Sequence, residues 1–123
     1  MNAPDWNPFR DLARRILRDG VPLILSDDVR ALVLRTAEEV SITDAEAALS
    51  TSAEALALLR ETERRIAEGS NRLTDALHLM WRFQRQGDFD SARQQMRDVL
   101  AVEVVPYYRE LALEQLSGMP DEP

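Results

Sequence analysis

The sequence predicts an all-α protein, a small helical bundle built on a long antiparallel helical hairpin. Apolar residues recur every three or four positions through most of the chain, which is the period of an amphipathic helix. These periodic segments begin at Ser, Thr, Asn or Asp and end near Gly or Pro, the residue types that begin and end helices. We expect the hairpin helices over about 52–86 and 89–117, with two to three shorter N-terminal helices packed on them.

The first predicted helix covers about 8–19. Asn7 is expected to cap it, with Pro8 in the first turn, where a missing N–H leaves no hydrogen bond unmade. Gly20 is expected to end the helix in a left-handed conformation. The apolar residues 21–25 include a proline, so they predict an extended connector that lies across the core.

Three further hydroxyl residues mark the starts of helices. Ser26 is expected to cap a second helix that runs to about residue 40. Thr43 and Thr51 are each followed by Glu at the third position, which is the spacing of a capping box. These signals predict a short third helix over about 44–49 and the start of the long helix near residue 52.

The long helix is predicted because residues 52–86 contain no Pro and one Gly, Gly69. Whether the helix continues through Gly69 is left open. Polar residues, Glu63 and Ser70, occupy two positions of its heptad stripe. The apolar positions of the stripe are Leu56, Leu59, Ile66, Leu73, Leu77 and Met80.

The last helix is expected to start at Asp88 or Asp90. Pro106 lies inside this segment and removes one backbone hydrogen bond, so we expect either a kink or a break there. The short turn at Gly87 and Asp88 requires the two long helices to pack antiparallel.

Composition indicates one soluble domain over 1–123, with frayed ends at 1–5 and 119–123. The net charge is −7, all 15 basic residues are Arg, and Cys is absent. The absence of Cys excludes disulfides, a thiol nucleophile and a thiolate metal site. Neither a secretory leader nor an apolar run of about 20 residues is seen, so we expect a cytoplasmic protein with no membrane contact.

Three stretches are similar to the DUSAM domain, a paralogous family of myxobacteria. They read DWNP at 5–8, VPLILSDDVRAL at 21–32 and ARQQMRDVLAVEVVPYYRE at 92–110. The resemblance spans about residues 5–116. It implies no activity, ligand, cofactor or catalytic residue, so no residue role follows from it.

No catalytic constellation is recognisable, and we predict that the protein is not an enzyme and holds no cofactor or metal. His78 is the only histidine and is expected to be a half-buried structural residue. Asp75 and His78 have the i, i+3 spacing of metal ligands in helical bundles, with Glu63 and Glu103 as further carboxylates. One histidine per chain leaves such a site incomplete.

Function is therefore predicted by exclusion: a non-catalytic protein-interaction or regulatory helical module, with an immunity-type antagonist as a narrower version. Its partner would be another protein or a second copy of itself. Arginine and aromatic residues anchor protein interfaces, so Arg60, Arg64, Trp81 and Tyr108 are candidate contacts. The competing interpretation of Trp81 is that it extends the core face.

The alternative function is a DNA-associated regulator that uses the arginine clusters of helix one and the long helix. The first cluster contains Arg14, Arg15 and Arg18. Acidic residues interleave with both clusters, whereas a surface that follows a phosphate backbone is continuously positive. Nucleic acid is for this reason the less favoured partner.

Overall fold

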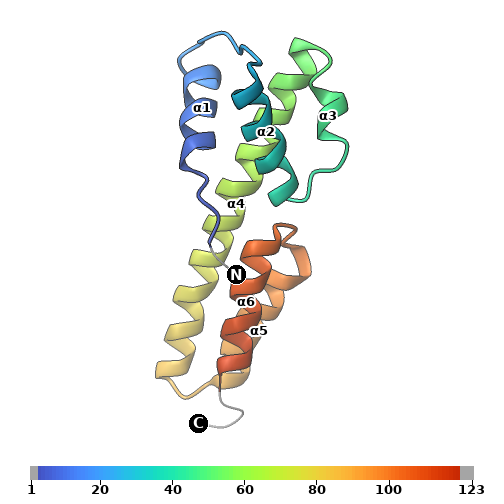
Figure 1. Ribbon diagram of the computed structural model, residues 1–123. Helices are drawn as coiled ribbons and strands as arrows, with labels where there is room; N and C mark the ends of the chain where they lie inside the picture. The colour runs from blue at the N-terminus through green and yellow to red at the C-terminus, as the bar shows by residue number, and fades with distance from the viewer. Residues whose placement is uncertain (1–2, 120–123) are drawn as a thin grey trace. The chain divides into compact units, whose positions relative to one another are not determined.

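A computed structural model describes residues 3–119, and these contain six helices and no strand (Figure 1). The all-α prediction is confirmed. No helix in the described residues is both long and apolar enough to cross a membrane. The helices are α1 (Asn7–Leu17), α2 (Asp27–Glu39), α3 (Ala45–Ala48), α4 (Ser52–Arg85), α5 (Phe89–Val102) and α6 (Pro106–Gly118).

The described residues form two compact units, 3–66 and 67–119, whose boundary falls inside α4. Unit 1 contains α1, α2, α3 and the first part of α4. Unit 2 contains the rest of α4 with α5 and α6. The single domain over 1–123 stays a prediction. Both ends of the chain are expected to fray. Residues 3–5 are not helical, whereas Met119 is buried. Residues 1–2 and 120–123 lie outside the described residues.

The core of unit 1 is made of apolar residues from all four of its helices. Helix α1 begins one residue earlier than predicted, with Trp6 as its cap residue, and the Asp5 carboxylate accepts a hydrogen bond from the Asn7 backbone N–H at 3.1 Å. Gly20 has the predicted left-handed conformation, with a φ of 74°, but α1 ends two residues earlier than predicted, at Leu17, and its C-cap is Arg18. The fully or nearly fully buried core side chains include Phe9, Ala13, Val33, Ala37, Leu49, Ala55 and Leu59.

The connector 21–25 is not helical, but it does not cross the core as predicted. Leu23 and Leu25 are half-buried, and Ile24 between them is 75% exposed. Successive side chains of an extended chain point to opposite sides, so an apolar run of this kind cannot bury all of its members against one surface.

Two of the predicted hydroxyl caps of unit 1 are confirmed. Ser26 accepts a hydrogen bond from the Val29 N–H at 3.3 Å, and Thr51 accepts one from the Glu54 N–H at 3.1 Å. Thr43 does not cap α3. Its place is taken by Asp44, whose φ of 57° turns the chain sharply into a helix of only four residues with no side-chain cap.

In unit 2, α4 is continuous through Gly69, turns at Gly87 (φ 77°) and is followed by α5, which runs antiparallel to it (Figure 1). The predicted hairpin is therefore present. Asp88 caps α5 by accepting a hydrogen bond from the Ser91 N–H at 3.1 Å.

The predicted helix 89–117 is broken into α5 and α6 rather than kinked. Pro106 occupies the first turn of α6 and disfavours a helical conformation in the residue before it; Val105 accordingly has a ψ of 117°. Arg109 bridges the break, because its guanidinium donates to the backbone carbonyls of Leu100 at 2.6 Å and Glu103 at 3.0 Å.

The corner between α5 and α6 is fixed to α4 by a buried carboxylate. One oxygen of Glu103 accepts hydrogen bonds from the N–H groups of Val104 and Val105, at 3.1 and 3.0 Å, and the other accepts one from Arg72 on α4 at 2.7 Å. Gly69 lets the Tyr108 ring lie against the α4 backbone, since a Cβ at Gly69 would stand 2.6 Å from Cε2 of that ring.

Candidate functional site: an arginine-lined cleft between α1 and α4

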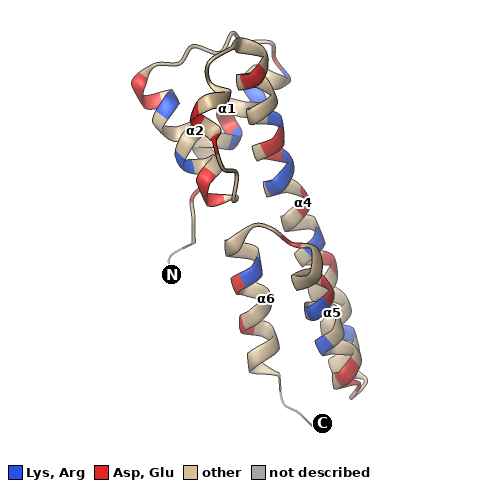
Figure 2. Cartoon of the chain, turned by 90° about the vertical axis from the view of Figure 1, so that its right-hand side faces the viewer, with Lys and Arg blue, Asp and Glu red and all other residues tan. Residues whose placement is uncertain are grey.

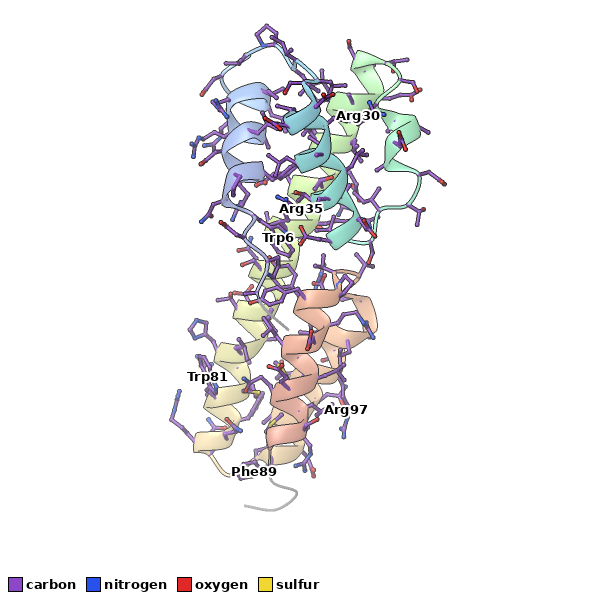
Figure 3. All side chains as sticks on the ribbon, in the orientation of Figure 1. Trp6, Arg30, Arg35, Trp81, Phe89 and Arg97 are labelled. Atoms are coloured by element: carbon purple, nitrogen blue, oxygen red, sulfur yellow. The ribbon has the colours of Figure 1, made fainter. Side chains whose placement is uncertain are left out.

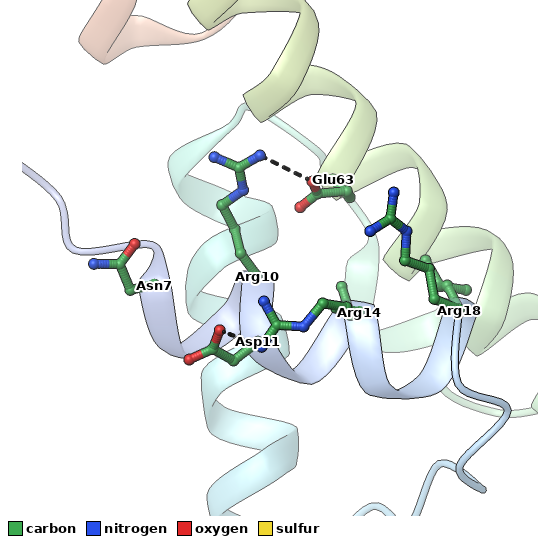
Figure 4. A pocket seen from close by; sticks show the side chains of 8 residues that line it. Asn7, Arg10, Asp11, Arg14, Arg18 and Glu63 are labelled. Atoms are coloured by element: carbon green, nitrogen blue, oxygen red, sulfur yellow. Dashed lines mark hydrogen bonds and ion pairs between the residues drawn. The ribbon is translucent and has the colours of Figure 1, made fainter.

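Helices α1 and α4 of unit 1 enclose a cleft of about 450 Å³ (Figure 4). Three arginines line it at intervals of four residues: Arg10 and Arg14 of α1, and Arg18, which caps the C-terminal end of α1. Side chains spaced four apart lie on one face of a helix, one turn above another. The other lining residues are Asn7, Asp11, Ala13 and Leu17 of α1 and Glu63 of α4.

The three guanidinium groups differ in how they are held. Arg10 donates to Glu63 across the cleft at 3.3 Å. Arg14 is paired with Asp11 at 3.0 Å, in a contact whose two side chains are both more than half exposed. The Arg18 guanidinium makes no hydrogen bond or ion pair with any part of the chain that the structure describes. The cleft therefore offers a ligand two guanidinium groups: that of Arg14, whose ion pair is exposed, and that of Arg18, which has no ion pair in the described residues.

Glu63 is the only residue of α4 that lines the cleft. Its Oε1 accepts the single bond from Arg10, whereas its Oε2 is buried and has no hydrogen-bond partner within residues 3–119. The sequence marked Glu63 as a polar interruption of an apolar stripe. The structure gives the reason, because this side chain faces the arginines of α1 rather than the apolar core.

This arrangement suits the binding of a carboxylate or a similar oxyanion. Guanidinium groups donate pairs of parallel N–H bonds that match the two oxygens of a carboxylate. Asp11 and Glu63 offset part of the positive charge of the three arginines, so the cleft is mixed in charge rather than a continuous basic surface. Sequence reasoning singled out Arg14 and Arg18 and missed Arg10, although the i, i+4, i+8 spacing from Arg10 was readable.

The other arginine cluster, Arg60, Arg64 and Arg65 on α4, includes two residues that bind Glu61 of the same helix. Arg64 Nε donates to Glu61 at 2.8 Å, and Arg65 joins Glu61 to the end of α2 through the carbonyls of Val40 and Ser41. The pKa of Glu61 is lowered to about 2, mainly by the hydrogen bond from Arg64. Partial burial of the carboxylate opposes this shift, and the hydrogen bond from Arg65 adds to it. Basic and acidic segments alternate along this part of α4 (Figure 2).

The four predicted contact residues do not form one site. Arg60 and Arg64 belong to unit 1, whereas Trp81 and Tyr108 belong to unit 2. Arg60 is exposed, and Arg64 is paired with Glu61. Tyr108 is buried against Gly69, so it cannot serve as a surface contact in this structure.

Trp81 does not extend the core face. It is 43% exposed and lies on the side of α4 away from α6 (Figure 3). His78 is also exposed, not half-buried as predicted, and its ring meets the Trp81 ring edge-on at 5.8 Å. The buried positions Leu73, Ala76 and Met80 define the core face of this part of α4, and both rings fall outside it.

No metal centre is visible in the described part of the chain. Among residues 3–119, no three or more His, Asp and Glu side chains come together as a group that could hold an ion. Asp75 and His78 are both exposed, and Glu103 is engaged by Arg72 and the backbone of the α5–α6 corner.

Comparison with known proteins identifies the family of this chain. The family model described as "Protein of unknown function (DUF2379)" matches residues 4–119. No curated protein and no solved structure matches the chain.

Proposed function

We propose that this chain, which belongs to the DUF2379 family of proteins of unknown function, is a non-catalytic protein-interaction module that binds its partner through the arginine-lined cleft. The observation that carries the proposal is the row of Arg10, Arg14 and Arg18 along one cleft, with the Arg18 guanidinium making no hydrogen bond or ion pair in residues 3–119. Arginine is among the residues that contribute most to protein interfaces.

Charge narrows the class of partner. The chain as a whole carries −7, which steers it towards a protein with a basic surface. The cleft, in contrast, accepts negatively charged groups. We therefore propose a partner that is basic overall and presents an exposed acidic segment, whose carboxylates enter the cleft.

The narrower versions of this function remain proposals too. An antagonist would mask the basic surface of its partner, as an immunity-type protein does, and a regulator would use the same contact reversibly. A homodimer is a further version, in which a second copy supplies the acidic segment. The cytoplasm stays the expected compartment, and the DUSAM resemblance over 5–116 agrees with a family of unknown function.

DNA association is the alternative, and the cleft does not favour it. Asp11 and Glu63 interrupt the arginine row, and the net charge opposes approach to a polyanion over about 10 Å at 0.1 M salt. DNA association is one outcome of the capture experiment described next.

The test is capture of the partner from native lysate with the tagged protein, at low and moderate salt and with nuclease added. We expect a protein to be captured by the wild type and lost with Arg14→Glu/Arg18→Glu. The matched control is Arg82→Glu/Arg97→Glu, which changes the net charge equally at exposed arginines outside the cleft and should keep the partner.

A partner that both double variants retain equally would overturn the cleft as the binding surface. Capture that nuclease abolishes would replace the proposal with the DNA-associated alternative. A partner retained by the control and lost with the cleft variant would support the proposal.

A further inference from the structure

The contact between Glu63 and Arg10 is poor for a pair of opposite charges. Its single hydrogen bond is 3.3 Å long, whereas charge-assisted bonds of this type are usually about 2.7–2.9 Å. The second oxygen, Oε2, is buried without a partner among residues 3–119. Buried carboxylate oxygens in folded proteins are rarely left in this state.

Other glutamates of the same chain show what a well-held carboxylate looks like. Glu61 on the same helix meets Arg64 and Arg65 at 2.8 and 2.9 Å. Glu103 accepts three hydrogen bonds between 2.7 and 3.1 Å. Among the described glutamates, Glu63 alone combines a long contact, an unpaired oxygen and a position facing three guanidiniums.

We infer that the Glu63 carboxylate occupies the arginine cleft as an internal competitor, and that a carboxylate of the partner replaces it on the arginines. The inference rests on the proposed function and assigns a regulatory part to one residue of that site. The side chain of Glu63 is 30% exposed, so it has a route to solvent when it is displaced.

The geometry of the row supports the replacement. Four residues of helix rise about 6 Å, so Arg10, Arg14 and Arg18 span about 12 Å along the cleft. In an extended peptide, alternate side chains on one face are about 6–7 Å apart. An extended acidic segment can therefore place successive carboxylates against successive arginines, whereas Glu63 reaches only Arg10.

Removal of the competing charge should strengthen binding. The experiment measures binding of a hexaglutamate peptide, and separately of inorganic phosphate, to the wild type and to Glu63→Gln. Calorimetry gives the Kd. The fluorescence of Trp6, next to the cleft residue Asn7, follows the same titration once Trp81→Phe has removed the other tryptophan.

We expect Glu63→Gln to bind hexaglutamate about two- to fivefold more tightly, the factor that corresponds to losing one partly exposed ion pair. Glu38→Gln is the control, because it makes the same charge change at an exposed position of α2 outside the cleft. Tight binding of phosphate as well would identify a general oxyanion site; binding of the peptide alone identifies carboxylates as the ligand.

The outcomes separate this inference from the proposed function. If Glu63→Gln and Glu38→Gln bind hexaglutamate equally well, Glu63 is not a competitor and this inference is refuted. If Arg14→Glu/Arg18→Glu abolishes binding in the same experiment, the cleft is still the binding surface. Weaker binding by Glu63→Gln would make Glu63 a ligand-contacting acceptor and also refute this inference. Peptide binding that the arginine substitutions leave unchanged would refute the cleft itself.

Discussion

Units 1 and 2 each set a glutamate against an arginine of another helix, and the two pairs differ in every respect that bears on function. Glu103 of unit 2 is 1% exposed and has partners for both oxygens, including the backbone N–H groups of the two residues before α6. Glu63 of unit 1 is 30% exposed, makes one long bond and leaves one oxygen unpaired.

The difference teaches how to separate a structural charge from one available for binding. A buried carboxylate with all its hydrogen bonds made holds three elements together, and replacing any of its partners disturbs the fold. A carboxylate that is partly exposed and partly unpaired contributes little to stability and can change partners. This contrast gives Glu103 a structural part and agrees with the binding part proposed for Glu63.

The largest expected effect comes from removing the arginine that pairs with Glu103. Arg72→Met leaves the buried Glu103 carboxylate without its countercharge and should lower the free energy of unfolding by about 3 kcal/mol. Arg10→Met is the matched change beside Glu63 and should cost less than about 1 kcal/mol, since that pair is exposed. Urea unfolding of both variants checks this, and equal costs would break the comparison.

The next effect tests how tightly the α5–α6 corner is held against α4. Gly69→Ala should destabilise the protein by about 1–2 kcal/mol, because the overlap of the new methyl group with Tyr108 outweighs the gain in helix propensity. In a Tyr108→Ala background the same change should cost nothing, which a double-mutant cycle would measure. Gly118→Ala, in open space, is the control.

The smallest expected effect concerns pH. The folded pKa of Glu61 is about 2, below its ordinary 4.5, so its contribution to stability is complete above pH 4.5 and is lost as the pH falls towards 2. Because the side chain is 35% exposed, solvent screening keeps this contribution below about 1 kcal/mol. The stability difference between wild type and Glu61→Gln should shrink from pH 5 to pH 2; a constant difference would contradict the assignment.

Much of the helical organisation could be predicted from local signals. The caps at Ser26, Thr51 and Asp88 and the left-handed conformation of Gly20 depend on residues within three or four positions of one another. Thr43 shows the limit of this reasoning. Its capping-box spacing is intact, yet the turn between α2 and α3 places Asp44 before the helix instead.

By itself, the sequence determined the all-α fold, the hairpin turn at Gly87 and the helix-disrupting effect of Pro106, because backbone propensity and capping act over a few residues. Only the tertiary structure decided which contacts Glu63 and Glu103 make. The partner of Glu63 is 53 residues away and that of Glu103 is 31 residues away. Such contacts depend on how helices pack, and no local pattern distinguishes a carboxylate that will be fully bonded from one that will be left with an unpaired oxygen.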